Sequence, residues 1–241
     1  RMYKLEQIQE IYKSRHEYAR KWKEETGGKV VGYFCTYVPE EILYAADILP
    51  VRILGSHEPQ SVTESHLFSM YCPFCRDCLA QGLLGKYDYL DGLVISLCCL
   101  HIRQSFSSWV EHVPVDFHYR IPMPHAHGKP AYSFLRKELV KFKNAVEEWT
   151  GKEIDDSDLS RGIDIVNKNR RLMSDVYSLR KSETPPITGL ESLYMVLSSQ
   201  VGEKEAHSRL LEDALADGLQ EGRLKDRQTG ARLMLIGSED D

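Results

Sequence analysis

Short apolar segments alternate with helical segments from residue 30 to residue 149, and this alternation limits the folds that the chain can adopt. Val30 to Phe34 is apolar and begins with two β-branched residues, and Pro39-Glu40-Glu41 then has the proline and acidic residues of a helix N-terminus. The same order is repeated along the chain. The expected strands are 30–34, 49–54, 90–97 and 115–121, and the expected helices are 39–46, 73–85, 102–112 and 132–149. This order predicts an α/β fold with a doubly wound parallel sheet.

The segments on either side of 29–151 have a different pattern. Residues 1–28 are expected to form an N-terminal helix that stops at Gly27-Gly28, and residues 152–230 carry helical patterns alone. Residues 231–241 contain one more apolar segment followed by a Gly-Ser turn. We expect this segment to be the first strand of a second α/β domain, so that the given sequence is a fragment of a longer protein.

The composition excludes several classes of protein. The 241 residues are 42% hydrophobic and 28% charged, which is typical of a globular protein. Neither a membrane-spanning apolar run nor a signal-peptide pattern occurs, so a cytoplasmic location is expected. The net charge of -5, without a basic stripe, argues against nucleic acid as a partner, and the lack of a spanning apolar run argues against a membrane.

Cysteines carry the strongest functional signal in the chain. They are Cys35, Cys72, Cys75, Cys78, Cys98 and Cys99. Cys72 comes directly before an expected helix, where the exposed N–H groups favour a thiolate. Cys98 and Cys99 follow an expected central strand, and ligands bind at the carboxyl ends of the strands in open parallel sheets. Cys72 and one of the adjacent pair are therefore candidate metal ligands.

Other interpretations of the C-x2-C-x2-C spacing at Cys72, Cys75 and Cys78 compete with this one. A ferredoxin-like cluster would need an irregular loop, and the usual fourth Cys-Pro is missing; a zinc site would need a second well-spaced pair of ligands. On a helix, Cys78 points about 120° away from Cys72. We therefore expect Cys75 and Cys78, and also Cys35, to pack as small buried residues.

Three segments resemble a known family. They are VGYFCTYVPEEILYAADILPVRILG (31–55), YCPFCRDCLAQGLLGKYDYLDGLVISLCCLHIRQSFSSW (71–109) and ARLMLIGS (231–238). The most specific elements are the P-E-E-I-x-x-A-A stretch, the Cys-Pro that leads to Arg76, and a cysteine followed four residues later by Arg103. Together they resemble the catalytic subunits of the 2-hydroxyacyl-CoA dehydratase and benzoyl-CoA reductase family.

The resemblance implies two flavodoxin-like domains joined by helices, with one [4Fe–4S] cluster held by three cysteines. Cys72 and Cys99 match two of these ligands, and the third is expected beyond Asp241. Arg76 and Arg103 are candidates to neutralise charge on the cluster or on CoA phosphates, with surface salt bridges as the alternative.

Two further residues are candidates for catalysis. His101 is a candidate proton donor, with a helix-surface histidine as the alternative. Glu41 is a second candidate, with a helix-start charge as the alternative.

The resemblance also implies a function. The sequence from Cys98 to Arg103 resembles the benzoyl-CoA reductase branch more closely, which implies low-potential electron transfer to an aromatic acyl-CoA. The alternatives are a 2-hydroxyacyl-CoA dehydratase subunit, which eliminates water, and a non-catalytic iron–sulfur docking subunit. The expected partners are a homologous catalytic subunit and an ATP-hydrolysing iron–sulfur activator. The chain has no G-x-x-x-x-G-K-[ST] loop, which is consistent with ATP being bound only by the activator.

Overall fold

A four-stranded parallel sheet forms the centre of the structure, which is a computed structural model describing residues 2–219, 223 and 224. The strands are β1 (Val30–Phe34), β2 (Leu49–Arg52), β3 (Gly92–Ser96) and β4 (Phe117–Ile121). Their order across the sheet is β2-β1-β3-β4, and each neighbouring pair is parallel. The chain therefore starts in the middle of the sheet and winds in both directions, which confirms the expected flavodoxin-like α/β fold.

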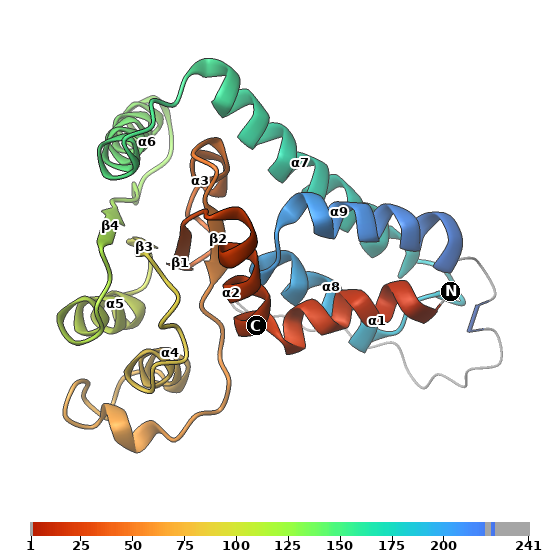
Figure 1. Cartoon of the computed structure of the whole chain (residues 1–241), viewed down its shortest axis with the longest axis horizontal. Coiled ribbons are helices and arrows are strands. Elements are labelled where there is room, and N and C mark those ends of the chain that lie inside the picture. The colour runs from red at the N-terminus through yellow and green to blue at the C-terminus, as the bar shows by residue number, and fades with distance from the viewer. Residues whose placement is uncertain (1, 220–222, 225–241) are drawn as a thin grey trace.

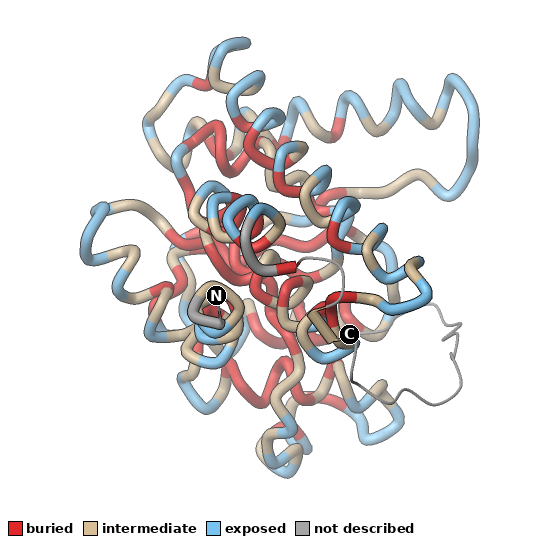
Figure 2. The backbone as a smooth tube through the Cα atoms, turned by 90° about the vertical axis from the view of Figure 1, so that its right-hand side faces the viewer, coloured by how far each residue is buried: buried red, intermediate tan, exposed pale blue. Residues whose placement is uncertain are grey.

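Helices cover both faces of this sheet. They are α3 (Glu40–Ala45), α4 (Pro73–Leu83), α5 (Leu100–His112) and α6 (Lys129–Thr150). Figure 1 shows α3 and α6 on one side of the strands and α4 and α5 on the other. The two faces follow from strand periodicity: Val31 and Tyr33 pack with α3 and α6, whereas Val30 and Phe34 pack with α4 and α5. The buried residues accordingly run through the centre of the molecule in Figure 2.

The N-terminal segment forms two helices where the sequence predicted one over residues 1–28. They are α1 (Met2–Lys13) and α2 (Arg15–Thr26), and Ser14 lies between them with its hydroxyl bonded to the Glu10 carbonyl. The predicted stop is present, because Gly27 has the left-handed φ of 67° that closes α2. The helix α2 packs on the sheet domain, with Ala19 in the core, whereas α1 packs against the helices that follow the sheet. The break therefore divides this segment between two parts of the molecule.

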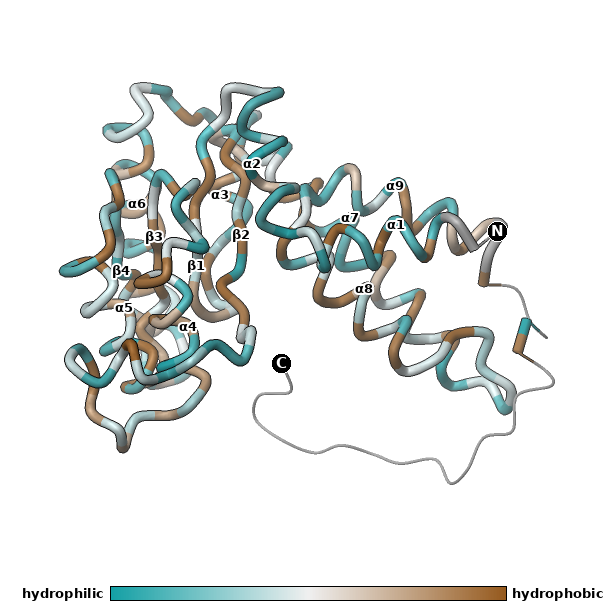
Figure 3. Tube along the Cα trace, turned by 60° about the horizontal axis from the view of Figure 1, so that its bottom comes forward, coloured by the Kyte–Doolittle hydropathy of each residue, from teal (hydrophilic) through white to brown (hydrophobic). Residues whose placement is uncertain are grey.

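The helical region forms a second layer beside the sheet domain (Figure 3). It contains α7 (Asp156–Leu179), α8 (Gly189–Val201) and α9 (Lys204–Asp213), followed by one π-helical turn at Ala214–Gly218. The strand predicted within 231–241 lies outside the described residues. Within the described part of the chain, none of the helices is both long enough and apolar enough to cross a membrane.

The helical region is fixed against the sheet domain at α3, the helix that follows β1. Gly162 of α7 lies so close to α3 that a Cβ atom there would be 2.2 Å from the Glu41 carbonyl oxygen. Glu41 also forms a 2.6 Å ion pair with Arg170. The neighbouring Glu40 forms a 3.0 Å ion pair with Lys204, a residue that is only 5% exposed. Backbone contact and buried charge thus hold the two parts together beside the carboxyl end of β1.

Candidate functional site

The carboxyl edge of the sheet brings together loops from distant parts of the chain. Because all four strands are parallel, the segments that follow β1, β3 and β4 leave the sheet on the same side. Cys35 is the first residue after β1, and Cys98 and Cys99 follow β3. Cys72 precedes α4, which starts beyond β2. Four of the six cysteines therefore belong to connections at one edge.

Cys72 is the N-cap of α4, and Pro73 is the first residue of the helix. The proline suits this position because its missing N–H would have no helical partner there. The Cys72 thiol makes no capping hydrogen bond, so it is available beside the positive end of the helix. The Cys72 backbone N–H instead donates to Nδ1 of His101 at 2.8 Å.

His101 connects the two cysteine-bearing loops, because it lies in the first turn of α5 and accepts from the start of α4. This hydrogen bond assigns the His101 proton to Nε2, since Nδ1 acts as the acceptor. The Tyr71 ring packs edge-on against the imidazole, with 5.1 Å between ring centroids. The ring is only partly buried, so Nε2–H is a donor held in a fixed orientation at the edge of the sheet.

Cys99 is the N-cap of α5 and, like Cys72, makes no side-chain capping bond. The loop before it is held by Arg103, whose Nη2 donates to the Leu97 carbonyl. The structure therefore gives Arg103 a contact that shapes the cysteine loop. Arg76 has a similar local contact, from Nη1 to the Ser69 carbonyl at 3.4 Å.

Two thiols at neighbouring helix N-termini are suitable ligands for an iron–sulfur cluster, which is held by thiolates and carries negative charge. Cys72 and Cys99 are both partly buried and pack against the main core. Within the described residues, no group of three or more His, Cys, Asp or Glu side chains could hold a metal ion. The described residues therefore do not by themselves assemble the three-ligand set that the resemblance implies.

Cys75 and Cys78 are not directed to this site. The segment is a regular helix, and both side chains are buried in the core between α4, α5 and the sheet. Ser105 of α5 donates to the Cys75 carbonyl at 2.9 Å, which fixes the two helices side by side. The three cysteines of the C-x2-C-x2-C motif therefore lie along one helix, and the Cys78 thiol points away from the Cys72 thiol, as the helical period predicted.

The expectation that Cys35 only packs in the core is wrong. Cys35 lies at the surface edge with a left-handed φ of 72°, and its Sγ accepts from the Cys98 Sγ at 3.0 Å. This hydrogen bond and partial burial raise the pKa of Cys98 well above its usual range. The sequence held a signal for this contact, since Cys35 follows its strand as Cys98 follows the neighbouring one. That β1 and β3 are neighbours is a property of the sheet order.

Glu41 lies at the N-terminus of α3, where its carboxylate forms the ion pair with Arg170 of α7. Glu40 accepts from the Tyr33 hydroxyl at 3.1 Å and pairs with Lys204. In this structure both acids contribute to the contact between the sheet domain and the helical region.

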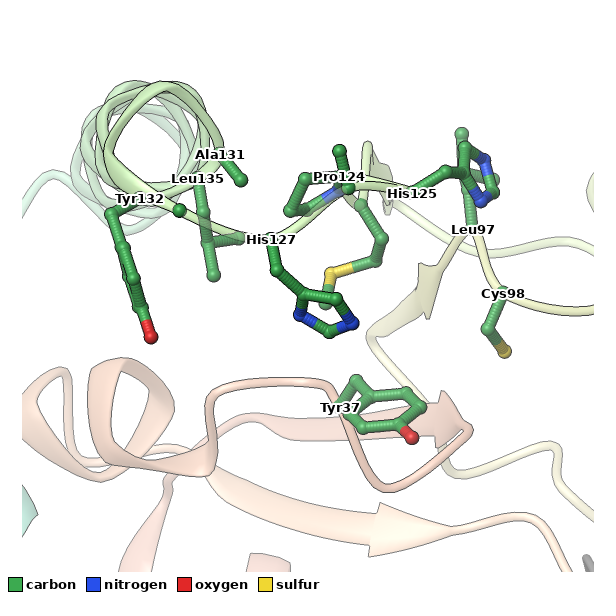
Figure 4. A pocket seen from close by; sticks show the side chains of 12 residues that line it. Tyr37, Leu97, Cys98, Pro124, His125, His127, Ala131, Tyr132 and Leu135 are labelled. Carbon is green, nitrogen blue, oxygen red and sulfur yellow. The ribbon is translucent and has the colours of Figure 1, made fainter.

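A cavity of about 380 Å³ opens at the same edge (Figure 4). In Figure 4, Tyr37 lies below the cavity, Cys98 lies at its right beneath Leu97, and His127 projects from the upper loop toward Tyr37. The lining is mainly apolar and comes from the segments after β1, β3 and β4: Tyr37, Leu97, Cys98, Met123, Pro124, His125, Ala126, His127, Gly128, Ala131, Tyr132 and Leu135. The sequence did not predict the contribution of the β4–α6 loop, because its histidines have no local partner that marks a site.

Curated relatives of the chain are subunits of acyl-CoA enzymes. The chain is 30% identical to a benzoyl-CoA reductase subunit of Thauera aromatica over 82% of its own length and 52% of the relative. It is 27% identical to the (R)-phenyllactyl-CoA dehydratase beta subunit of Clostridium sporogenes, covering 83% of this chain and 54% of the relative. It is 28% identical to the (R)-2-hydroxyglutaryl-CoA dehydratase beta subunit of Acidaminococcus fermentans, covering 83% of this chain and 55% of the relative. The chain spans about half the length of these relatives.

A family model confirms this relationship over most of the chain. The model described as 2-hydroxyglutaryl-CoA dehydratase, D-component, matches residues 35–239. The match begins at the cysteine after β1 and includes both cysteine-bearing helix N-termini. The chain therefore belongs to the 2-hydroxyglutaryl-CoA dehydratase D-component family, together with the beta subunits of 2-hydroxyacyl-CoA dehydratases and the matched benzoyl-CoA reductase subunit.

Proposed function

We propose that this chain is part of a benzoyl-CoA reductase-like subunit, in which a [4Fe–4S] cluster delivers low-potential electrons to an aromatic acyl-CoA. The observation that carries the proposal is the position of Cys72 and Cys99 as N-caps of α4 and α5, with His101 joining the two loops. The benzoyl-CoA reductase subunit among the relatives supports the reductase branch. A cytoplasmic location and a homologous catalytic partner subunit belong to the same proposal.

Cys72 and Cys99 would hold the cluster, and the third ligand is proposed to lie beyond Asp241. When bound, the cluster supplies single electrons at a potential that protein side chains do not reach. An ATP-hydrolysing activator would provide these electrons. The positive N-terminal ends of α4 and α5 would face the anionic cluster, and Nε2–H of His101 offers one further donor to an anionic group at this edge.

The cavity after β1, β3 and β4 is our proposed site for the acyl group. Its apolar lining and the rings of Tyr37 and Tyr132 suit an aromatic acyl chain, and its volume of about 380 Å³ lies in the range of small-molecule pockets. Cys98 lines the cavity and is adjacent in sequence to the proposed ligand Cys99. An acyl group bound there would thus lie beside the loop that holds the cluster.

A second candidate function is the elimination of water from a 2-hydroxyacyl-CoA. The dehydratase beta subunits among the relatives and the description of the family model favour it. Reductase and dehydratase would share the cluster site and differ in the substrate. A non-catalytic docking subunit would hold a cluster without responding to either thioester.

Iron and acid-labile sulfide per chain, with an EPR spectrum after reduction, test the cluster site in anaerobically purified full-length protein. We expect roughly four irons per chain. The Cys72→Ser and Cys99→Ser variants should lose them, and the Cys98→Ser variant, which changes the adjacent exposed thiol, should keep them. Iron that survives in Cys99→Ser but not in Cys98→Ser would contradict the assignment of Cys99.

Substrate identity is tested by adding thioesters to the same protein with its partner subunit. Benzoyl-CoA should perturb the EPR spectrum of the cluster if the reductase proposal holds. A perturbation by a 2-hydroxyacyl-CoA alone would favour the dehydratase, and a spectrum that neither thioester changes would favour the docking subunit.

A further inference from the structure

Cys35 and Cys98 form a second pair of thiols at the carboxyl edge, separate from the two proposed cluster ligands. Their strands are neighbours in the sheet, with Phe34 paired with Ile95, so both cysteines emerge from the same part of the edge. Their sulfur atoms are 3.0 Å apart. A disulfide needs a separation of about 2.05 Å, so the two sulfurs have to approach by about 1 Å. Side-chain rotation can supply much of such a movement.

The surroundings of the pair allow a reagent to reach it. Cys98 is exposed and lines the cavity of about 380 Å³, whereas Cys35 is partly buried. Cys35 has a left-handed φ of 72°, which is uncommon for a residue other than glycine, and its carbonyl accepts from Val38 N–H at 3.3 Å. Backbone of this kind is found preferentially at functional sites. The turn holds the Cys35 sulfur against Cys98 instead of within the core.

We propose that Cys35 and Cys98 are a redox-active pair that hydroperoxides convert to a reversible disulfide. Cys35, reacting as its thiolate, attacks the O–O bond of hydrogen peroxide while the Cys98 sulfur lies 3.0 Å from its own. Cys35 becomes a sulfenic acid, and the released hydroxide takes up a proton to leave as water. The Cys98 sulfur then attacks the Cys35 sulfur, and a second water leaves with the Cys98 proton. The two thiols lose two electrons in total, and the peroxide accepts both.

The disulfide would connect the ends of two neighbouring strands at the residue before Cys99. Because Cys99 is the N-cap of α5, oxidation would restrict the loop that positions this helix N-terminus. Reduction by a dithiol would restore the two thiols. The pair therefore adds a response to oxidants at the edge of the sheet, and it stands on the contact between Cys35 and Cys98 whether or not the cluster proposal holds.

The test treats the full chain with hydrogen peroxide, blocks the remaining thiols with an alkylating reagent, and maps the tryptic peptides without reduction. Trypsin releases Cys35 in residues 30–52, and Cys98 with Cys99 in residues 87–103. We expect these two peptides to be joined, two thiols per chain to be lost, and dithiothreitol to restore both. The link should disappear in Cys35→Ser and in Cys98→Ser and persist in Cys99→Ser and Cys72→Ser.

Three results would overturn the proposal. The first is a link that persists in Cys98→Ser but disappears in Cys99→Ser, because the bond would then use the other cysteine. The second is oxidation of Cys35 or Cys98 to a sulfinic acid without a link. The third is a thiol count that peroxide leaves unchanged. If Cys35→Ser does not fold, the exposed Cys98→Ser substitution still decides between these outcomes.

Discussion

Replacing Gly162 by alanine should destabilise the contact between α7 and α3 on which the arrangement of the two parts depends. The new Cβ would lie 2.2 Å from the Glu41 carbonyl oxygen, 3.1 Å from its carbonyl carbon and 3.2 Å from the Ala45 nitrogen. All three are backbone atoms, so no side-chain rotation relieves the overlap. The helix α7 must move away by roughly 1 Å to restore ordinary contact. That movement also stretches the 2.6 Å ion pair between Glu41 and Arg170.

The expected cost follows from two opposing effects. Overpacking costs about 1–3 kcal/mol and sometimes more, and a contact as short as this one belongs at the upper end. Alanine in a helix interior recovers about 1 kcal/mol relative to glycine. We therefore expect the free energy of unfolding of Gly162→Ala to fall by roughly 2 kcal/mol, which lowers the urea midpoint by about 0.7–1 M at an m-value of about 2–3 kcal/mol per M.

Urea unfolding followed by circular dichroism measures this change, with Gly189→Ala as the matched control. Gly189 is the first residue of α8, and a Cβ there has no atom within 4 Å. The control should match the parent protein or exceed its stability by up to about 1 kcal/mol. If Gly162→Ala is as stable as Gly189→Ala, the close crossing of α7 over α3 is not present in the protein, and the reasoning fails.

Two further predictions concern the helical region. Burial, together with the charge of Lys204, lowers the pKa of His207 to about 3 in the folded protein. In the unfolded chain this pKa returns to its usual value of 6.5. The unfolded state therefore binds the extra proton below pH 6.5, so stability is complete above that pH and falls by roughly 1.4 kcal/mol per unit between pH 6.5 and 3. Urea midpoints at pH 7 and pH 5 should show a smaller loss in His207→Gln, and an equal loss in both proteins would contradict the assignment. Asp155 caps α7 by accepting hydrogen bonds from the N–H groups of Ser157 and Asp158. Asp155→Ala should therefore lower the free energy of unfolding by about 1 kcal/mol, whereas Asp155→Asn should retain most of the capping stabilisation. Equal losses of stability in the two variants would show that the cap contributes little.

Much of the fold and part of the site could be predicted from local sequence signals. Proline at position 73 and the glycine at 27 mark helix ends because their backbone preferences act within one turn, and both ends are present in the structure. The alternation of strands and helices predicted the parallel sheet, because a helix between two strands favours parallel pairing. The helical period alone predicted that Cys78 and Cys72 face different directions.

Tertiary structure decided the contacts between segments that are distant in sequence. Local patterns show which face of a strand is buried, but only the packed sheet makes β1 and β3 neighbours and so brings Cys35 to Cys98. In the same way, the bond from Cys72 to His101 and the ion pair between Glu41 and Arg170 depend on how whole helices pack. Local sequence signals predicted most of the strands and helices and placed Cys72 and Cys99 at helix N-termini, because capping, turn and periodicity signals act within a few residues. The partners of those residues were decided only by the fold, because side-chain contacts across a sheet or a helix crossing have no local signal.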